Sequence, residues 1–316
     1  MIRIVAFMAY WLGIDVVFYW LNRKAKRILA FHAILPDAMF RSGVANGVSN
    51  RLSELLTIVK ECQKRYRISN DLQDARTLTL TFDDGYRNQY SIAFKELMRL
   101  GVPAYVFVAG DVVDGRVLMV DKLLHWVSEV PVQYVPGGNR LAYWSNEIWP
   151  KFMADVQHGG LSVYDELNRI YPYDRIVASL PDDYVCERLG SIAEVEMDEM
   201  RDGGWKIGWH TQTHLPLSRQ TEEQLRRQMT PPEKMGNVCF CYPYGNPCEV
   251  GESAVRLAEE LGYPCAVSCT NSASENSSRY FLPRMSLSPD KYMLHFELSG
   301  FKHFLKHRRL LPIVKG

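Results

Sequence analysis

The sequence lacks an excess of charge of either sign, because 37 lysines and arginines face 36 aspartates and glutamates and leave a net charge of +1. Proteins that bind nucleic acid carry a basic excess for the phosphates, so nothing here supports a nucleic-acid partner. The chain also lacks internal repeats and low-complexity tracts, which excludes repeat architectures and long disordered linkers. Its 316 residues, 47% of them hydrophobic, suffice for one large domain, alone or with an appendage.

Cysteine is scarce and forms no framework. The chain has seven cysteines, an odd number, and is too long to need disulfide staples, which favours a reducing, cytoplasmic location. Cys239, Cys241 and Cys248, and Cys265 with Cys269, are not spaced like the C-x2-C pairs of zinc sites. We expect these cysteines to be small core residues.

The N-terminal segment is apolar over residues 2–21, where only Arg3 and Asp15 are charged, and a basic run at 22–27 follows. A cleavable signal peptide would have its positive charge before the apolar run and small residues after it. Three structures remain: a helix packed on the domain, an interfacial helix and a membrane span, in that order of preference. A span would place Asp15 in the bilayer at a cost of about 2.5 to 3.5 kcal/mol. We therefore treat 1–26 as an apolar and basic helix that brings the protein to the inner face of a membrane if it binds lipid.

Apolar strand-like segments alternate with amphipathic helical segments along most of the chain. Expected strands lie at 27–32, 77–82, 103–108, 206–210, 238–242 and 264–268. Expected helices lie at 49–66, 91–100, 221–229 and 250–261. This alternation predicts an α/β fold with a parallel sheet, which enough repeats can close into a barrel. In such folds the chemistry collects where the strands end.

The alternation is lost at about 115–199, a stretch rich in aromatic residues and interrupted by proline and glycine. We interpret it as a mostly helical or irregular insertion on one barrel loop. Its aromatic side chains could stack on sugar rings, although packing of the insertion against the barrel is the more common role for such residues.

Two polar clusters follow predicted strands. Asp83 and Asp84 come after an alternating apolar run at 78–82, and His210 and His214 come after another apolar stretch. Taken alone, the acidic pair is as typical of an Asp-Gly turn as of a site. Two imidazoles four residues apart and one carboxylate, however, make a three-ligand set that leaves positions open for water and substrate, as catalytic divalent metals require.

These segments resemble the polysaccharide deacetylases with a NodB homology domain, carbohydrate esterase family 4. The T-F-D-D-G motif of that family occurs at 81–85, its H-[ST]-x-x-H motif at 210–214, and its motif containing P-Y-G at 242–245, in the family's order. The resemblance extends over about 27–300 and is nearest to exopolysaccharide and O-antigen-type members. It implies a distorted (β/α) barrel, deformed from the TIM type and seven-stranded, followed by a basic tail at 301–316.

The resemblance implies one divalent metal ion held by Asp84, His210 and His214. Zinc is the default for this ligand set, which also accepts cobalt, nickel, iron or manganese. By the same resemblance, Asp83 is the general base. Adjacent strand residues point in opposite directions, so both aspartates can serve one site only if the turn reorients one of them.

The P-Y-G loop supplies the remaining contacts that the resemblance implies. The backbone N–H of Tyr244 would stabilise the oxyanion, and Pro243 and Gly245 would contact substrate. Many members have an arginine two residues before this proline, where this chain has Cys241. We expect Arg284, in a later Leu-Pro-Arg segment, to reach Asp83 instead, although a surface arginine paired with any nearby acid is an equal alternative.

The general acid is open between two histidines. His295 follows a leucine, as in the Leu-His pair that ends many members, and His32 ends the first predicted strand and could face the same mouth. For either, a structural histidine is the alternative.

The leading hypothesis is a hydrolase acting on carbon-nitrogen, non-peptide bonds. It would remove N-acetyl or N-formyl groups from an amino sugar of a polysaccharide, oligosaccharide or lipid-linked saccharide. The expected partner is a carbohydrate or glycolipid substrate, with peripheral membrane contact and no obligate protein partner. Two alternatives remain: an inactive glycan-binding or scaffold protein with the same fold, and a metal-dependent esterase or amidase acting on a non-sugar substrate.

Overall fold

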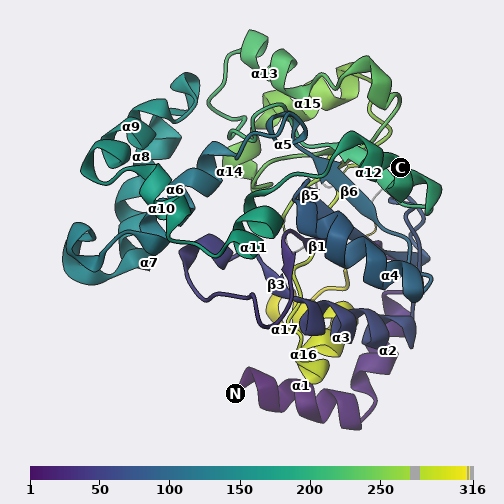
Figure 1. The fold of residues 1–316 in the computed structure, drawn as a ribbon. Coiled ribbons are helices and arrows are strands. Elements are labelled where there is room, and N and C mark those ends of the chain that lie inside the picture. Colours follow the sequence, from purple (N-terminus) through teal and green to yellow (C-terminus); the bar gives the residue numbers. More distant parts are fainter. Residues whose placement is uncertain (271–277, 312, 314–316) are drawn as a thin grey trace.

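The computed structural model describes residues 1–270, 278–311 and 313. Its centre is a curled, seven-stranded parallel sheet surrounded by helices (Figure 1). The strands are β1 (Arg27–Phe31), β4 (Arg67–Ile68), β5 (Thr77–Asp84), β6 (Tyr105–Val108), β7 (Lys206–Trp209), β8 (Phe240–Cys241) and β9 (Ala266–Val267). Their spatial order is β1-β5-β6-β7-β8-β9, with β4 beside the start of β5. The predicted α/β fold, a distorted barrel of parallel strands inside helices, is confirmed.

The two edges of the curled sheet are joined by residues 282–285. Leu282 forms a parallel bridge with Val267 of β9, and Met285 forms one with Leu29 of β1. This segment closes the barrel with isolated bridges in place of a regular strand. It also carries Arg284 to the ends of the other strands.

Strand β5 lies at the centre of the sheet, and all eight of its residues are buried. Its sequence alternates threonine with leucine or phenylalanine. Phe82 stacks on Phe31 of β1 and on Trp205, which directly precedes β7. A buried central strand with neighbours on both sides fixes the register of its last residues, Asp83 and Asp84.

Helices cover the outside of the barrel between consecutive strands. They are α3 (Leu52–Gln63), α4 (Lys95–Arg99), α5 (Gly110–Val113), α12 (Glu194–Asp202), α13 (Glu222–Met229), α14 (Pro247–Val250) and α15 (Glu252–Glu260). A separate two-stranded sheet, β2 (Ile34–Leu35) with β3 (Asn50–Arg51), lies beside the end of β1.

The stretch between α5 and α12 is helical and forms its own layer on one side of the barrel, drawn in teal in Figure 1. Its helices are α6 (Met119–Glu129), α7 (Arg140–Tyr143), α8 (Trp149–Ala154), α9 (Leu161–Ile170), α10 (Tyr173–Ala178) and α11 (Asp182–Tyr184). Helices α6 to α10 share a second hydrophobic core, in which Trp126, Phe152 and Ile176 are fully buried, whereas Tyr184 of α11 packs with Leu35 and Leu180. We refer to residues 115–199 as the insertion.

The N-terminal segment forms two helices in place of the single helix expected over 1–26. They are α1 (Ile2–Trp11) and α2 (Ile14–Leu21). No single described helix is long and apolar enough to cross a membrane. Together, α1 and α2 have the required length and apolar composition, but the two helices are bent by 85° at the break between them. Asp15 is buried and pairs with Arg65 at 2.5 Å, so α2 is fastened to the domain.

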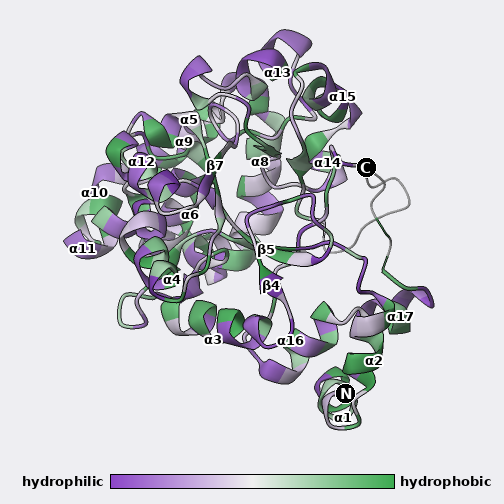
Figure 2. Ribbon diagram, turned by 90° about the vertical axis from the view of Figure 1, so that its right-hand side faces the viewer, coloured by the Kyte–Doolittle hydropathy of each residue, from purple (hydrophilic) through white to green (hydrophobic). Residues whose placement is uncertain are grey.

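Near the C-terminus, the basic segment expected to be a tail contains α17 (Phe301–His307), which follows α16 (Lys291–Leu298). Ala6 and Ala9 of α1 pack on Met293 and Phe296 of α16. Helix α1 therefore lies beside α16, and the strongly hydrophobic α1 and α2 project from the body (Figure 2).

Candidate metal and catalytic site

The predicted site residues meet at the C-terminal ends of the strands. Asp83 and Asp84 end β5, and His210 directly follows β7. Tyr244 lies three residues after β8, and Arg284 arrives on the closing segment. Parallel strands present their carboxyl ends at one edge of a sheet, so residues as far apart as 83 and 284 come together there.

The metal-ligand set assembles as expected. Asp84 Oδ1 lies 3.5 Å from His210 Nε2 and 3.2 Å from His214 Nε2. Atoms bonded to one ion at about 2.0–2.2 Å in a tetrahedral arrangement are roughly 3.3–3.6 Å apart. Asp84 Oδ1 is buried and has no hydrogen-bond partner among the described residues, an arrangement that is costly unless a cation satisfies it. The three residues therefore fit a divalent cation.

The orientation of His210 is set by a second contact. Its Nδ1–H donates to the Cys241 carbonyl at 2.7 Å. A carbonyl can only accept, so the neutral ring keeps the lone pair of Nε2 directed at Asp84. Such a contact from the other ring nitrogen is typical of histidines that bind metal.

The charge states of the ligands also suit a cation. Burial lowers the pKa of His214 to about 4, so this imidazole is neutral at neutral pH, the form that binds metal. Burial by itself raises the pKa of Asp84, but the proximity of His214 and His210 outweighs burial and holds that pKa below its usual value. The ligand set thus presents one carboxylate and two imidazoles.

Asp83 faces Arg284, as predicted, in a bidentate pair. Arg284 donates to Asp83 Oδ1 at 2.7 Å and to Oδ2 at 2.6 Å, and both side chains are fully buried. Burial raises the pKa of Asp83, but the guanidinium outweighs it and the net pKa lies below the usual value. The same guanidinium also donates to Thr81 Oγ1 and lies 3.1 Å from the Cys241 sulfur.

Backbone strain is concentrated at this site. Five described residues other than glycine have a positive φ, and four of them are Asp84, Thr211, His214 and Tyr244. The φ of 80° at Asp84 turns the end of β5, so that neighbouring carboxylates serve one site. Thr211, a β-branched residue at φ 66°, is the most unusual of the four, and such strain is typical of functional sites.

The P-Y-G loop borders the metal ligands. The Tyr244 ring lies 4.9 Å from the His214 ring, and the Tyr244 hydroxyl donates to the His214 carbonyl at 3.2 Å. Within the described part of the chain, the Tyr244 N–H donates to no protein atom, so it is free for an oxyanion. Gly245, at φ 73°, has no room for a side chain, because a Cβ would lie 2.2 Å from the Cys269 nitrogen. Pro243 precedes Tyr244 in this loop, and its carbonyl accepts from the Gly245 N–H.

The two candidate general acids are separated by the structure. His32 Nε2 lies 3.7 Å from Asp83 Oδ2, and its side chain is 21% exposed, so it faces the site and solvent. His295 is buried in α16, where it contacts Glu61 at 3.2 Å and the Tyr10 ring. The contacts of His295 thus belong to the packing of α1, α3 and α16, and the structure does not bring it to the aspartates.

Three neighbours of the site were not anticipated. The Gln89 amide donates to the carbonyls of Asp83 and His32, which ties two strand ends together. Cys269 lies 3.0 Å from Arg284, and the Trp149 ring of the insertion packs edge-on against Tyr244. Spacing along the sequence could not reveal these contacts, because each joins segments with unrelated patterns.

Sequence comparison gives no relatives: no protein-family model and no curated protein sequence matches the chain. Structural comparison does give them. The deacetylase PplD of Streptococcus pyogenes, in complex with acetate, aligns with a TM-score of 0.52 and 14% identity, covering 84% of this chain and 93% of that one. IcaB from Ammonifex degensii aligns with a TM-score of 0.52 and 15% identity, covering 87% and 97%.

A third similar structure is a de-N-acetylase from Aggregatibacter actinomycetemcomitans, with a TM-score of 0.50, 12% identity and coverage of 84% and 95%. At these identities the likeness is one of fold. The chain has the fold of these deacetylases, over most of its length and nearly all of theirs.

Proposed function

We propose that the protein is a metal-dependent hydrolase that removes N-acetyl or N-formyl groups from an amino sugar of a saccharide. The observation that carries this proposal is the convergence of Asp84, His210 and His214 on one point, beside an ionised Asp83 held by Arg284. The likeness to deacetylases supports it.

The reaction is hydrolysis of an amide. Water adds to the acyl carbon, the carbon-nitrogen bond breaks, and the products are a carboxylate and the free amine. The ligand triad would hold a divalent ion, zinc by default, which when bound acts as a Lewis acid and lowers the pKa of a coordinated water to about 7.

The protein's own groups then have distinct roles. Asp83 accepts the proton of the attacking water, while Arg284 orients its carboxylate and keeps it ionised. The free N–H of Tyr244 donates to the developing oxyanion. His32 donates the proton that the leaving amine requires, because it lies beside Asp83 and is open to solvent.

We also propose that the protein works at the inner face of a membrane, which it contacts through α1 and α2. Half of the exposed large hydrophobic side chains of the described residues lie within the first 21 residues. The Phe18 ring packs on Phe301 at 4.7 Å, so α2, followed by the exposed Arg23 and Lys24, lies against the basic α17. An apolar face beside basic side chains suits an anionic lipid surface.

The enzymatic proposal is tested by acetate release from N-acetylglucosamine oligosaccharides and lipid-linked N-acetylglucosamine, with zinc supplied. We expect release by the native protein and a loss of roughly 10²–10⁴ in rate for Asp83→Asn, the contribution typical of a general base. Asp114→Asn, an exposed acid outside the site, is the control and should leave the rate unchanged.

The proposal would be contradicted if the native protein released no acetate from any sugar substrate, or if the native protein and Asp83→Asn released it at equal rates. Release only from an acetate ester or an acetanilide would instead favour the non-sugar alternative. Circular dichroism of Asp83→Asn separates lost chemistry from lost folding.

A further inference from the structure

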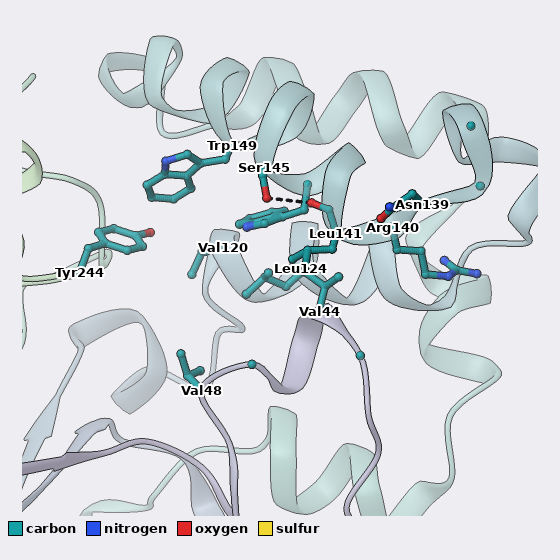
Figure 3. Close-up of a pocket in the computed structure, with 15 residues that line it drawn as sticks. Val44, Val48, Val120, Leu124, Asn139, Arg140, Leu141, Ser145, Trp149 and Tyr244 are labelled. Atoms are coloured by element: carbon teal, nitrogen blue, oxygen red, sulfur yellow. Dashed lines mark hydrogen bonds between the residues drawn. The ribbon is translucent and has the colours of Figure 1, made fainter. Parts of the chain in front are cut away.

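The insertion borders an open, apolar cavity beside the site that the reaction does not require. Its volume is about 1160 Å³, which exceeds the roughly 300–1,000 Å³ of ordinary ligand pockets. The walls come from the insertion and from the segment 43–48 of the barrel (Figure 3). The apolar side chains that line it include Val44, Val48, Val120, Leu124, Leu141 and Trp144.

The polar side chains in the wall already have partners in the protein backbone. Arg140 donates from its guanidinium to the carbonyls of Val127 and Val130, and its head points away from the labelled apolar side chains in Figure 3. The Ser145 hydroxyl donates to the Leu141 carbonyl at 2.8 Å, and Asn139 Oδ1 accepts from the N–H of Ala142. What this wall offers to a ligand is therefore mainly apolar surface, which favours a hydrocarbon.

The cavity borders the catalytic site at Tyr244, whose ring lies between the two. One side of this ring packs with His214, a proposed metal ligand. The ring also packs with Trp149, 5.0 Å away, and both Tyr244 and Trp149 line the cavity. A hydrocarbon chain on a molecule bound at the ligand triad would therefore need to pass only the Tyr244 ring to reach the apolar space.

We propose that the substrate is an amino sugar that carries a hydrocarbon chain, and that this cavity holds the chain. The inference rests on the proposed function and specifies its substrate class. The chain can be attached in two ways, as a lipid on the sugar's glycosidic oxygen or as a long acyl group on its nitrogen. The exposed apolar helices α1 and α2 agree with a substrate drawn from a lipid surface.

The test measures the binding of three probes to the protein by tryptophan fluorescence. Each probe is used below its critical micelle concentration. The probes are methyl N-acetylglucosaminide, dodecyl N-acetylglucosaminide and the methyl glycoside of N-dodecanoylglucosamine. Each buried methylene should tighten binding by roughly two- to fourfold. We expect one of the long-chain probes to bind at least a hundredfold more tightly than the methyl probe, and the attachment that does so identifies the source of the chain.

A matched pair of double variants locates the effect. Val48→Asn with Leu141→Asn changes two exposed wall residues, whereas Val195→Asn with Leu161→Asn changes the same residue types, exposed but outside the cavity. The first pair should lose at least tenfold in long-chain affinity and leave the methyl probe unaffected, and the second should behave like the native protein.

Equal affinity for all three probes, or equal losses in both double variants, would overturn the inference. Release of the carboxylate in the same samples, acetate from the two N-acetyl probes and dodecanoate from the N-dodecanoyl probe, addresses the proposed function separately. If the carboxylate is released but affinity does not depend on chain length, only the proposal of a hydrocarbon-binding cavity fails. If affinity depends on chain length but nothing is released, only the proposal of a hydrolase fails.

Discussion

At the scale of single residues, the pairing of Asp83 with Arg284 is the feature that makes this site unusual. A carboxylate this deeply buried would ordinarily hold its proton, and a protonated acid cannot act as a base. Arg284 reverses this by donating two hydrogen bonds in the fork geometry that only arginine offers. The Cys241 sulfur lies 3.1 Å from the same guanidinium.

Replacing Arg284 with methionine should therefore change the pH dependence of activity. With the guanidinium gone, only His210 and His32 oppose the effect of burial on Asp83 and its pKa rises, so the acidic limb of kcat/KM should move up by about 1 to 3 pH units. Loss of one partner of a buried pair should also lower the free energy of unfolding by roughly 3–5 kcal/mol.

The measurement is a pH–rate profile with a thermal melt, and Arg116→Met, which removes an exposed pair, is its control. An unshifted acidic limb would show that Asp83 does not act as the base.

Much of this residue-scale arrangement could be predicted from the sequence. The two aspartates follow a strongly patterned strand, and the histidine pair carries its own spacing. The sequence could not decide whether His32 or His295 is the general acid, because both histidines lie in or directly after apolar segments. They differ in their distance from Asp83, which only the structure shows. Trp149 could not be predicted either, since its contact with Tyr244 depends on how the insertion folds back.

At the scale of elements, a buried polar network fastens the insertion to the catalytic turn. The Tyr86 hydroxyl, two residues after Asp84, donates to Asp121 of α6 at 2.8 Å. Arg188 pairs with the same carboxylate at 2.9 Å and lies over the Tyr86 ring. Any movement of α6 would therefore act on the turn that holds Asp83 and Asp84.

A histidine in α6 should make the free energy of unfolding depend on pH. Burial lowers the pKa of His125 in α6 to about 4, so between pH 6.5 and 4 the unfolded chain takes up a proton that the folded chain does not. Stability therefore falls as pH falls through this window, by on the order of 3 kcal/mol for this group.

Urea unfolding of the native protein and of His125→Gln at pH 7 and pH 4.5 isolates the effect. The variant should lose less stability between the two pH values. Equal losses would mean that His125 does not stay neutral in the fold.

The elements were predictable to different degrees for a physical reason. The strongly alternating β5 was located almost to its ends, whereas β8 and β9 are two-residue pairings within longer extended segments. Their hydrogen bonds depend on neighbours supplied by distant parts of the chain. The closing segment 282–285 pairs only through isolated bridges. Such limited pairing does not require the alternating pattern of a regular strand, so the sequence does not reveal that this segment closes the barrel.

At the scale of the whole molecule, the helix pair at the N-terminus should decide membrane contact. Leu12→Asp with Val17→Asp places charge on its exposed face and should weaken binding to vesicles of anionic lipid by at least about tenfold. Leu161→Asp with Val195→Asp makes the same changes on other exposed surfaces and should leave binding unchanged. Vesicle flotation is the measurement, and equal flotation of both double variants would argue against contact through α1 and α2.

The measurement that tests the central claim most directly is the metal content of the purified protein after dialysis with zinc. The native chain and Asp83→Asn should each retain about one ion, because Asp83, although close to His210 and Cys241, has both carboxylate oxygens bonded to Arg284. The double variant His210→Gln with His214→Gln should retain none and release no acetate. A native protein without bound metal, or a double variant that keeps both its ion and its activity, would contradict the account.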